Sequence, residues 1–521
     1  MNHLELGKQH HRKREWKKAI SCYEQYINEH QSSPPEEVFR LLARTLRFRG
    51  NANRSLQVIH EGLKVYPNQP SLLIELHHHY DYTAEWKKAK SVAKQLVKLD
   101  QSNPDHLFRL GRTYSFLKHY SKAKQAYKKA IEKKHHLSLS SLIKKIEEGF
   151  PGDSTYQSEY RFTDGKNNVG AIIHRSHSKQ YFTKISTLSG KNNGAAREET
   201  FYKEVCSDFP DIKPFVPGYV NVQRIDDLSY LTMEMIDAIP STQEHAKKVI
   251  KDSHHLTNVP YTEIKGKYPP PRYVYQFKKG RGISVVHFFT QIHKESYNTK
   301  LFKLLHTIAK QNDYPSTVKD MITRLERAIM DKRLFEKIIP AEHYSLLHGD
   351  YAYQNILIDK ESHSPQVIDW STFTLGPRFI DIARYVTSLP LPFHEIEALY
   401  LEDEQSGKNL SSIEKIFFLY SLVVFYFQKL GIRKMETEAS VTLLPALEQL
   451  ERFVLHMDNE VNPMKAEDLQ NLNIKQLQQR VTVLEQERSH LEKRLEDMEN
   501  SKSWKITRPL RLLTEGARGK D

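Results

Sequence analysis

Polar residues set between short apolar runs, at residues 347–370, restrict the possible folds more than any other feature of this sequence. Asp350 is followed five residues later by Asn355, and Asp369 ends an apolar run further along the chain. The apolar residues between 356 and 368 are typical of a short β-hairpin. Such a hairpin would bring the two carboxylates and the amide to one end of the strands, where the three side chains could act on one ligand.

This set of side chains suits the transfer of a phosphoryl group. One carboxylate must accept the proton of an attacking hydroxyl, and a second carboxylate with an amide oxygen must hold Mg²⁺ against a triphosphate. The spacing makes Asp350 the candidate base, and it makes Asn355 and Asp369 the candidate metal ligands. His348, two residues before the base, is expected to organise the loop and counts with Asp350 as a catalytic candidate.

The pattern His-Gly-Asp-x₄-Asn that begins at His348, with Ile-Asp-Trp ending at Trp370, resembles the motifs of a known family. It is similar to the catalytic and metal motifs of aminoglycoside phosphotransferases and choline kinases. The resemblance covers roughly residues 156–457. It implies a two-lobed, protein-kinase-like fold that uses ATP and Mg²⁺, with a small lobe at 156–240 and a large lobe at 241–457.

Further segments extend the resemblance to other site residues. Gly-Pro-Arg-Phe-Ile-Asp-Ile-Ala at 376–383 looks like the family segment whose aspartate braces the catalytic loop, which would make Asp381 structural. By position, Lys184 would be the ATP-binding lysine and Glu198 its partner. Leu-Thr-Met-Glu-Met at 231–235 resembles the hinge strand, whose backbone would meet adenine near Glu234 and Met235.

The short spacing after the motif separates this chain from protein kinases. Only 11 residues lie between Asp369 and Asp381, which leaves no room for a long activation segment that docks a peptide, so a protein kinase is disfavoured. The expected phosphate turn at 163–170 has two glycines rather than Gly-x-Gly-x-x-Gly, but its backbone N–H groups could still hold phosphate. Four aromatic residues near the site either stack on a sugar or cation or belong to the core: Tyr351, Tyr353, Trp370 and Phe373.

Residues 1–136 repeat with a period near 34. Small residues recur at Ala19, Ser55, Ala89 and Ala123, and prolines recur at matching intervals near the unit boundaries. This pattern resembles the tetratricopeptide repeat, which implies a solenoid of helical hairpins with a groove that binds a protein partner. The alternative is that the solenoid only packs against the next domain.

The net charge of +14 is placed unevenly along the chain. Residues 1–136 carry +13 and residues 500–521 carry +4, so the rest of the chain carries −3. A catalytic domain that acts on nucleic acid would carry the basic excess itself, so no nucleic-acid partner is expected. The basic ends favour an acidic partner or an anionic membrane, or they are simply solvated.

The remaining segments complete the expected organisation. We expect a linker at 137–155 and a coiled coil at 466–499, whose apolar seam alternates spacings of three and four and favours a homo-oligomer. The tail at 500–521 mixes Trp504 and leucines with cations, which suits either peripheral contact with a membrane or a free tail. Its Ser-x-Ser-Trp-Lys segment is similar to tails of bacterial enzymes of surface-polysaccharide assembly.

The sequence therefore predicts a multidomain chain of α and α+β class. Its parts are an α-helical repeat solenoid, a two-lobed kinase-like domain and a C-terminal coiled-coil helix. We expect an ATP-dependent kinase that phosphorylates a hydroxyl of a small molecule, most simply a sugar, glycan or glycolipid. The alternatives are an inactive kinase-fold scaffold and a choline- or aminoglycoside-type kinase. With two distant cysteines and no leader pattern, the expected location is the cytoplasm, with the tail as a peripheral contact at the inner face of the membrane.

Overall fold

The computed structural model describes most of the chain up to residue 457. The described residues are 2–13, 15–30, 34–152, 155–162, 168–188, 194–268, 285–312, 314–402, 410–430 and 439–457. The expected coiled coil at 466–499, the tail at 500–521 and most of the expected phosphate turn lie outside them. Within the described part, no helix combines the length and the apolar character needed to cross a membrane.

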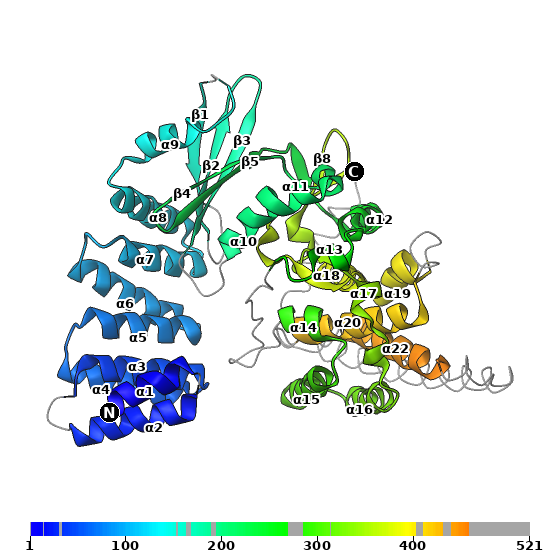
Figure 1. The fold of residues 1–521 in the computed structure, drawn as a ribbon, viewed down its shortest axis with the longest axis horizontal. Coiled ribbons are helices and arrows are strands. Elements are labelled where there is room, and N and C mark those ends of the chain that lie inside the picture. Colours follow the sequence, from blue (N-terminus) through cyan, green and yellow to red (C-terminus); the bar gives the residue numbers. More distant parts are fainter. Residues whose placement is uncertain are drawn as a thin grey trace, which may run out of the picture. The chain divides into compact units, whose positions relative to one another are not determined.

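The N-terminal part is a stack of helical hairpins, drawn in blue in Figure 1. Its helices are α1 (His3–Arg12), α2 (Trp16–Glu29), α3 (Glu36–Phe48), α4 (Ala52–Val65), α5 (Pro70–Tyr82), α6 (Trp86–Leu99), α7 (Pro104–Phe116) and α8 (Tyr120–His135). The prolines that mark the unit boundaries begin α5 and α7, where a missing N–H costs no helical hydrogen bond.

The turns inside the hairpins α3–α4, α5–α6 and α7–α8 share one feature. Gly50, Ala84 and Lys118, each 34 residues after the last, all adopt a positive φ of 58–78°. The recurring small residues Ala19, Ser55, Ala89 and Ala123 are fully buried between helices. The period seen in the sequence is therefore a structural period, and the predicted repeat solenoid is confirmed.

The early small position of the repeat also has a physical explanation. A Cβ on Gly7 would lie 2.5 Å from the ring of Tyr23, and one on Gly111 would lie 2.8 Å from the ring of Tyr127. Glycine is needed in these two units because a tyrosine 16 residues later fills the space.

Helix α9 (Leu139–Glu147) lies within residues 137–155, where the sequence analysis expects a linker. The side chain of Ser138 accepts a hydrogen bond from the N–H of Ser141 and so caps the helix, and the spacing of Leu139, Leu142 and Ile146 buries one face. That face shares one buried cluster with α8 and with the sheet that follows. Part of this segment is therefore core that joins the last repeat to the small lobe.

The small lobe is a five-stranded antiparallel sheet in the order β1-β2-β3-β5-β4, drawn in cyan and green in Figure 1. The strands are β1 (Gln157–Arg161), β2 (Asn168–Arg175), β3 (Gln180–Thr187), β4 (Tyr219–Ile225) and β5 (Leu228–Glu234). Between β3 and β4 run the helices α10 (Gly194–Thr200), η1 (Phe201–Val205), α11 (Cys206–Asp208) and η2 (Pro210–Phe215).

The large lobe is mainly helical, with two small sheets, β7–β10 and β6–β8–β9, that carry the predicted motif. Its helices are η3 (Gln243–His245), α12 (Ala246–Thr257), α13 (Tyr261–Ile264), α14 (Val285–Gln291), α15 (Glu295–Gln311), α16 (Ser316–Asp331), η4 (Leu334–Lys337), α17 (Pro340–His343), η5 (Tyr353–Asn355), η6 (Trp370–Thr372), α18 (Phe379–Ser388), α19 (Phe393–Ile396), η7 (Glu397–Leu401), α20 (Ser412–Leu430), η8 (Ala439–Leu443) and α22 (Leu444–His456). Its strands are β6 (Ala238–Pro240), β7 (Tyr344–Leu347), β8 (Ile356–Asp359), β9 (Pro365–Val367) and β10 (Thr374–Pro377). The apolar run in α20 is buried from Ile416 to Phe427, so α20 is the core helix of this lobe. The predicted two-lobed, kinase-like architecture is confirmed.

Candidate active site

The catalytic-loop candidate begins where strand β7 ends, and its glycine is sterically required. Gly349 has a φ of +80°, a conformation that side chains with a Cβ rarely adopt. A Cβ at this position would lie 2.4 Å from the carbonyl oxygen of Thr372. The hydroxyl of Thr372 also donates to the carbonyl of His348 at 3.1 Å. The loop can therefore approach the segment after Asp369 only with glycine here.

Asp381 on α18 holds the backbone of this loop. Its carboxylate accepts the N–H of His348 at 2.6 Å and the N–H of Gly349 at 3.1 Å. The side chain is only 4% exposed. Burial raises the pKa of Asp381 to about 7, although the two N–H bonds act in the opposite direction. This geometry is what a brace for the loop requires.

His348 connects the two halves of the motif. Its Nδ1 accepts the N–H of Asp350 at 3.2 Å, so Nε2 carries the proton and donates to the carbonyl of Ile368 at 2.9 Å. Burial lowers the pKa of His348, which keeps the ring neutral. The histidine thereby ties the loop of Asp350 to the residue before Asp369.

Asn355 ties the same two segments a second time. Its Nδ2 donates to the carbonyl of Asp350 at 2.8 Å, and its own carbonyl accepts the N–H of Ile368 at 2.9 Å. With the amide nitrogen turned toward the backbone, Oδ1 is the atom that the side chain presents as a ligand. The hydrogen bonds of Asn355 therefore connect the loop of Asp350 to the residue before Asp369.

Asp369 has a strained backbone and faces the small lobe. Its φ of 64° and ψ of 56° are left-handed, a conformation that is rare outside glycine. Its side chain is 44% exposed, and its Oδ1 accepts a hydrogen bond from Lys184 Nζ at 3.0 Å. The ammonium of Lys184 lowers the pKa of Asp369, so the carboxylate is ionised at neutral pH.

Lys184 on β3 also pairs with Glu198 on α10, as the resemblance implies. The ammonium donates to both oxygens of Glu198, at 3.0 and 2.7 Å, and the glutamate is only 2% exposed. Burial raises the pKa of Glu198 to about 7, against the effect of Lys184. Burial would lower the pKa of Lys184, but Asp369 and Glu198 raise it. One ammonium thus holds two carboxylates from different lobes.

Helix α10 and the η1 turn that follows it pack on aromatic residues, which shows whether the four aromatic residues are core or are free to contact a ligand. The ring of Phe201 stacks on Trp370 at 3.8 Å, and the guanidinium of Arg197 lies 4.2 Å from the ring of Phe373. Trp370 and Phe373 are each 1% exposed, and Tyr351 is 2% exposed. These three side chains are core and are not placed to stack on a ligand. Tyr353 alone of the four is partly exposed.

The hinge candidates lie at the end of β5, next to β3 and the segment before β4. The N–H of Glu234 donates to the carbonyl of Gly218 at 2.7 Å, and the N–H of Met235 donates to the carbonyl of Gln180 at 2.9 Å. Both N–H groups are therefore engaged. An adenine ring that binds beside these two residues would hydrogen-bond to their carbonyl oxygens, unless one of the two backbone hydrogen bonds breaks.

Arg384 on α18 is a site residue that the sequence reasoning missed. Its Nε and Nη2 donate to Oδ1 of Asp350 at 3.3 and 3.1 Å, and its Cζ lies 5.7 Å from the ring centre of Phe425. Arg384 follows Asp381 by three residues, which places both on one helical face. That spacing is the signal from which it could have been found.

A metal ion at this site would have few protein ligands. Within the described part of the chain, no group of three or more histidine, cysteine, aspartate or glutamate side chains is arranged to hold a metal ion. A cation here would depend on the amide oxygen of Asn355 together with Asp369, completed by phosphate oxygens and water. Hard oxygen ligands of this kind, with few from the protein, fit the preference of Mg²⁺.

Comparisons with known proteins agree with the resemblance seen in the motif. Residues 282–410 match the sequence model of the phosphotransferase enzyme family. This matched range contains Asp350, Asn355, Asp369 and Asp381. No curated protein matches the chain in a sequence search.

Solved structures match different shares of the chain. Spectinomycin phosphotransferase APH(9)-Ia, in complex with ADP and spectinomycin, is 18% identical over 60% of this chain and 93% of its own, with a TM-score of 0.34. The MamA protein is 19% identical over 25% of this chain and 71% of its own, with a TM-score of 0.24. A tetratricopeptide repeat protein from Parabacteroides merdae ATCC 43184 is 18% identical over 27% of this chain and 55% of its own, with a TM-score of 0.25.

Proposed function

We propose that residues 156–457 transfer the terminal phosphoryl group of ATP to a hydroxyl of a small molecule. The observation that carries the proposal is the connected network around Asp369. Lys184 reaches Asp369 from the small lobe, while His348 and Asn355 tie the residue before Asp369 to the loop of Asp350. A chain with no catalytic role would not need two carboxylates and an amide held in this way.

Each residue of the network has a role in this proposal. Lys184, oriented by Glu198, would hold phosphate oxygens of the nucleotide. Asn355 and Asp369 would hold Mg²⁺, which when bound neutralises charge on the triphosphate and orients it. Asp350 would orient the acceptor hydroxyl and take its proton as the phosphoryl group moves.

Arg384 is a positioning residue in this scheme. Its two hydrogen bonds to Oδ1 fix the orientation of the Asp350 carboxylate. Because Asp381 on the same helix fixes the backbone of the loop, α18 sets both the position and the rotation of the base. The catalytic geometry would then be built into the large lobe before substrate binds.

For the acceptor we propose a sugar hydroxyl on a glycan or glycolipid of bacterial surface-polysaccharide assembly. The support is the likeness of the tail at 500–521 to tails of enzymes of that process. The burial of Tyr351, Trp370 and Phe373 weakens the case for an aromatic cage around a cation, and so for a choline-type acceptor.

The other parts of the chain complete the proposal. The repeats would dock a protein partner, and the segment at 466–499 would form a homo-oligomeric coiled coil. The protein would act in the cytoplasm, with its tail in peripheral contact with the inner face of the membrane.

Calorimetry of nucleotide binding separates a kinase from an inactive scaffold. The kinase reading predicts that ATP binds at least tenfold more tightly with Mg²⁺ than with EDTA, and that Asp369→Asn removes most of the difference. The matched control Asp359→Asn changes a partly exposed aspartate in the same hairpin and should leave this difference intact. ATP binding of equal affinity with and without Mg²⁺ would favour an inactive scaffold. Screening of ATP consumption against sugars, lipid-linked glycans, choline and aminoglycosides then identifies the acceptor.

A further inference from the structure

The first helices of successive repeats form one continuous polar face. His11 on α1 hydrogen-bonds Thr45 on α3 at 2.9 Å. Arg44 on α3 donates to Glu75 on α5 at 2.8 Å, and His77 on α5 hydrogen-bonds Thr113 on α7 at 3.0 Å. Each contact joins positions about one repeat apart. The helices α1, α3, α5 and α7 therefore lie side by side with polar side chains between them.

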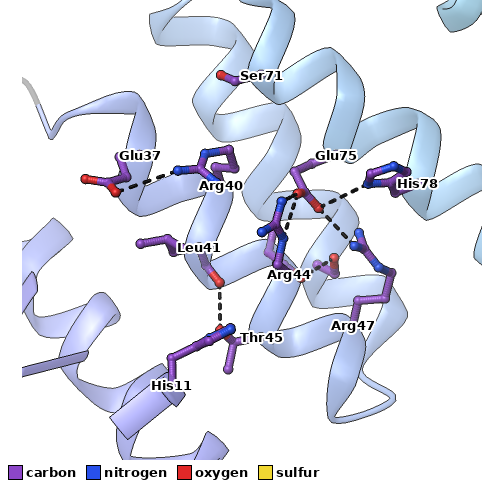
Figure 2. A network of polar contacts seen from close by, with 12 residues as sticks. His11, Glu37, Arg40, Leu41, Arg44, Thr45, Arg47, Ser71, Glu75 and His78 are labelled. Atoms are coloured by element: carbon purple, nitrogen blue, oxygen red, sulfur yellow. Dashed lines mark hydrogen bonds and ion pairs between the residues drawn. The ribbon is translucent and has the colours of Figure 1, made fainter. Parts of the chain in front are cut away.

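Arginines on this face outnumber the carboxylates that they meet. Arg44 and Arg47 both donate to Glu75, which is fully buried (Figure 2). On the next helix pair, Arg112 donates to Asp81 at 3.1 Å. Figure 2 also shows His78 on the far side of Glu75, with its Nδ1 at 4.0 Å from the carboxylate. Three guanidiniums thus share two carboxylates.

Arg109 adds a fourth guanidinium, and no carboxylate of the described residues forms an ion pair with it. Its Nη1 donates to the backbone carbonyl of Asp105 at 3.1 Å. Within the described part of the chain, Nε of Arg109 and Nε of Arg112 are buried without a hydrogen-bond partner, as is Nη1 of Arg47. Burial lowers the pKa of Arg109, which reflects the cost of a charge that is poorly solvated and poorly paired. We define the arginine face as Arg44, Arg47, Glu75, Arg109 and Arg112.

A purely structural role explains the ion pairs of this face but does not explain Arg109. The pairs with Glu75 and Asp81 bind neighbouring helices to one another and need no further explanation. Among the described residues Arg109 makes no such pair, and Asp105 and Glu75 favour its charge only through longer-range attraction. A half-buried cation that is incompletely paired in this way destabilises the fold. An anionic ligand that pairs with it would relieve this cost.

We propose that the arginine face binds an acidic, extended segment of a partner polypeptide. Packed helices lie about 8–10 Å apart, and an extended chain advances about 3.3 Å per residue. Carboxylates three residues apart on a peptide would therefore match successive helices of the stack. Guanidiniums suit this role because they hold carboxylates through two parallel N–H bonds. The recessed arginines, unlike exposed lysines, are poorly placed to meet a flat membrane surface.

This inference deepens the partner-docking role proposed above and names the chemistry of the partner. It also assigns a function to part of the basic excess of residues 1–136. The sequence period supports the assignment, since Arg44, His78 and Arg112 occupy the same position in three successive repeats.

The test uses the full chain and a fluorescein-labelled peptide with glutamates at every third position and alanines between them. Fluorescence anisotropy at low salt should show binding that weakens as salt is added. Arg109→Gln with Arg112→Gln should weaken binding at least tenfold, as expected for the loss of charge-assisted hydrogen bonds. The control Lys94→Gln with Lys98→Gln removes the same charge from exposed positions on α6 and should change affinity less than threefold.

Three results would overturn the inference. They are no peptide binding, equal loss in the two double variants, and binding of phosphatidylserine vesicles without binding of the peptide. A purely structural role would make Arg109→Gln alone lower the melting temperature, whereas we expect no decrease. Hydrolysis of Mg·ATP in the same samples should stay unchanged, which separates this inference from the proposed catalysis.

Discussion

The ion pair between Lys184 and Glu198 allows a prediction that separates its effect on stability from its effect on nucleotide binding. Lys184→Met removes the ammonium that donates two hydrogen bonds to a carboxylate only 2% exposed. In the wild type, burial raises the pKa of Glu198 to about 7, above the ordinary value of about 4.3. The stability associated with the protonated form is therefore present at low pH and is lost as pH rises through 7.

Without Lys184 the pKa of Glu198 rises further, so the variant keeps losing stability above pH 7 where the wild type no longer does. The deficit relative to the wild type grows by at most about 1.4 kcal/mol per pH unit, which gives about 3 kcal/mol at pH 9. For a domain of about 300 residues, 1 kcal/mol shifts the transition by roughly 1.6 °C, so the expected drop in melting temperature is roughly 5 °C. At pH 6 the deficit should be small.

Scanning calorimetry of the full chain at pH 6 and pH 9 measures this effect. The matched variant Lys184→Met with Glu198→Met removes the titrating group, and its deficit should not grow with pH. Mg·ATP binding should be lost in both variants, since neither restores the ammonium. A deficit that is equal at the two pH values, or a double variant with the same pH slope as the single one, would refute the reasoning.

Three further substitutions test the loop and its supports. Gly349→Ala should lower turnover by at least tenfold and destabilise the domain by about 1–3 kcal/mol in denaturant unfolding. The reason is that the added Cβ would meet Thr372 and that the φ of residue 349 is positive. Wild-type stability of this variant would contradict the steric argument. Asp381→Asn keeps one acceptor for two N–H groups, so unfolding should cost about 1–3 kcal/mol less, and unchanged stability would exclude its role as a brace. Arg384→Gln should reduce turnover roughly tenfold at unchanged ATP affinity, with partial rescue by Arg384→Lys, because Asp350 loses its orientation; a change in ATP affinity alone would contradict this.

Much of the candidate site could be predicted because its residues follow one another at fixed spacing. Asn355 and Asp369 flank the paired strands β8 and β9, and the side chain of Asn355 donates to the carbonyl of Asp350, so local chain geometry connects these segments. The period of 34 in the repeats likewise reflects contacts between adjacent helices, which recur with the sequence.

Contacts that depend on tertiary packing were not predictable in this way. Arg384 reaches Asp350 only because α18 passes under the loop, and 34 residues separate them. The choice between core and ligand contact for Trp370 depended on the position of Phe201 on a helix of the other lobe. Helix α9 was missed because a short helix between domains gains its stability from the surfaces that it covers.

The most direct measurement compares phosphoryl transfer and nucleotide binding in Asp350→Ala. Turnover of Mg·ATP, with water and with any acceptor that the screen identifies, should fall by at least about 100-fold, as expected for loss of a catalytic base. The dissociation constant for Mg·ATP should stay within about threefold of the wild type, and the exposed control Glu361→Gln should alter neither quantity. Undiminished transfer by Asp350→Ala would contradict the assignment on which the proposed chemistry depends.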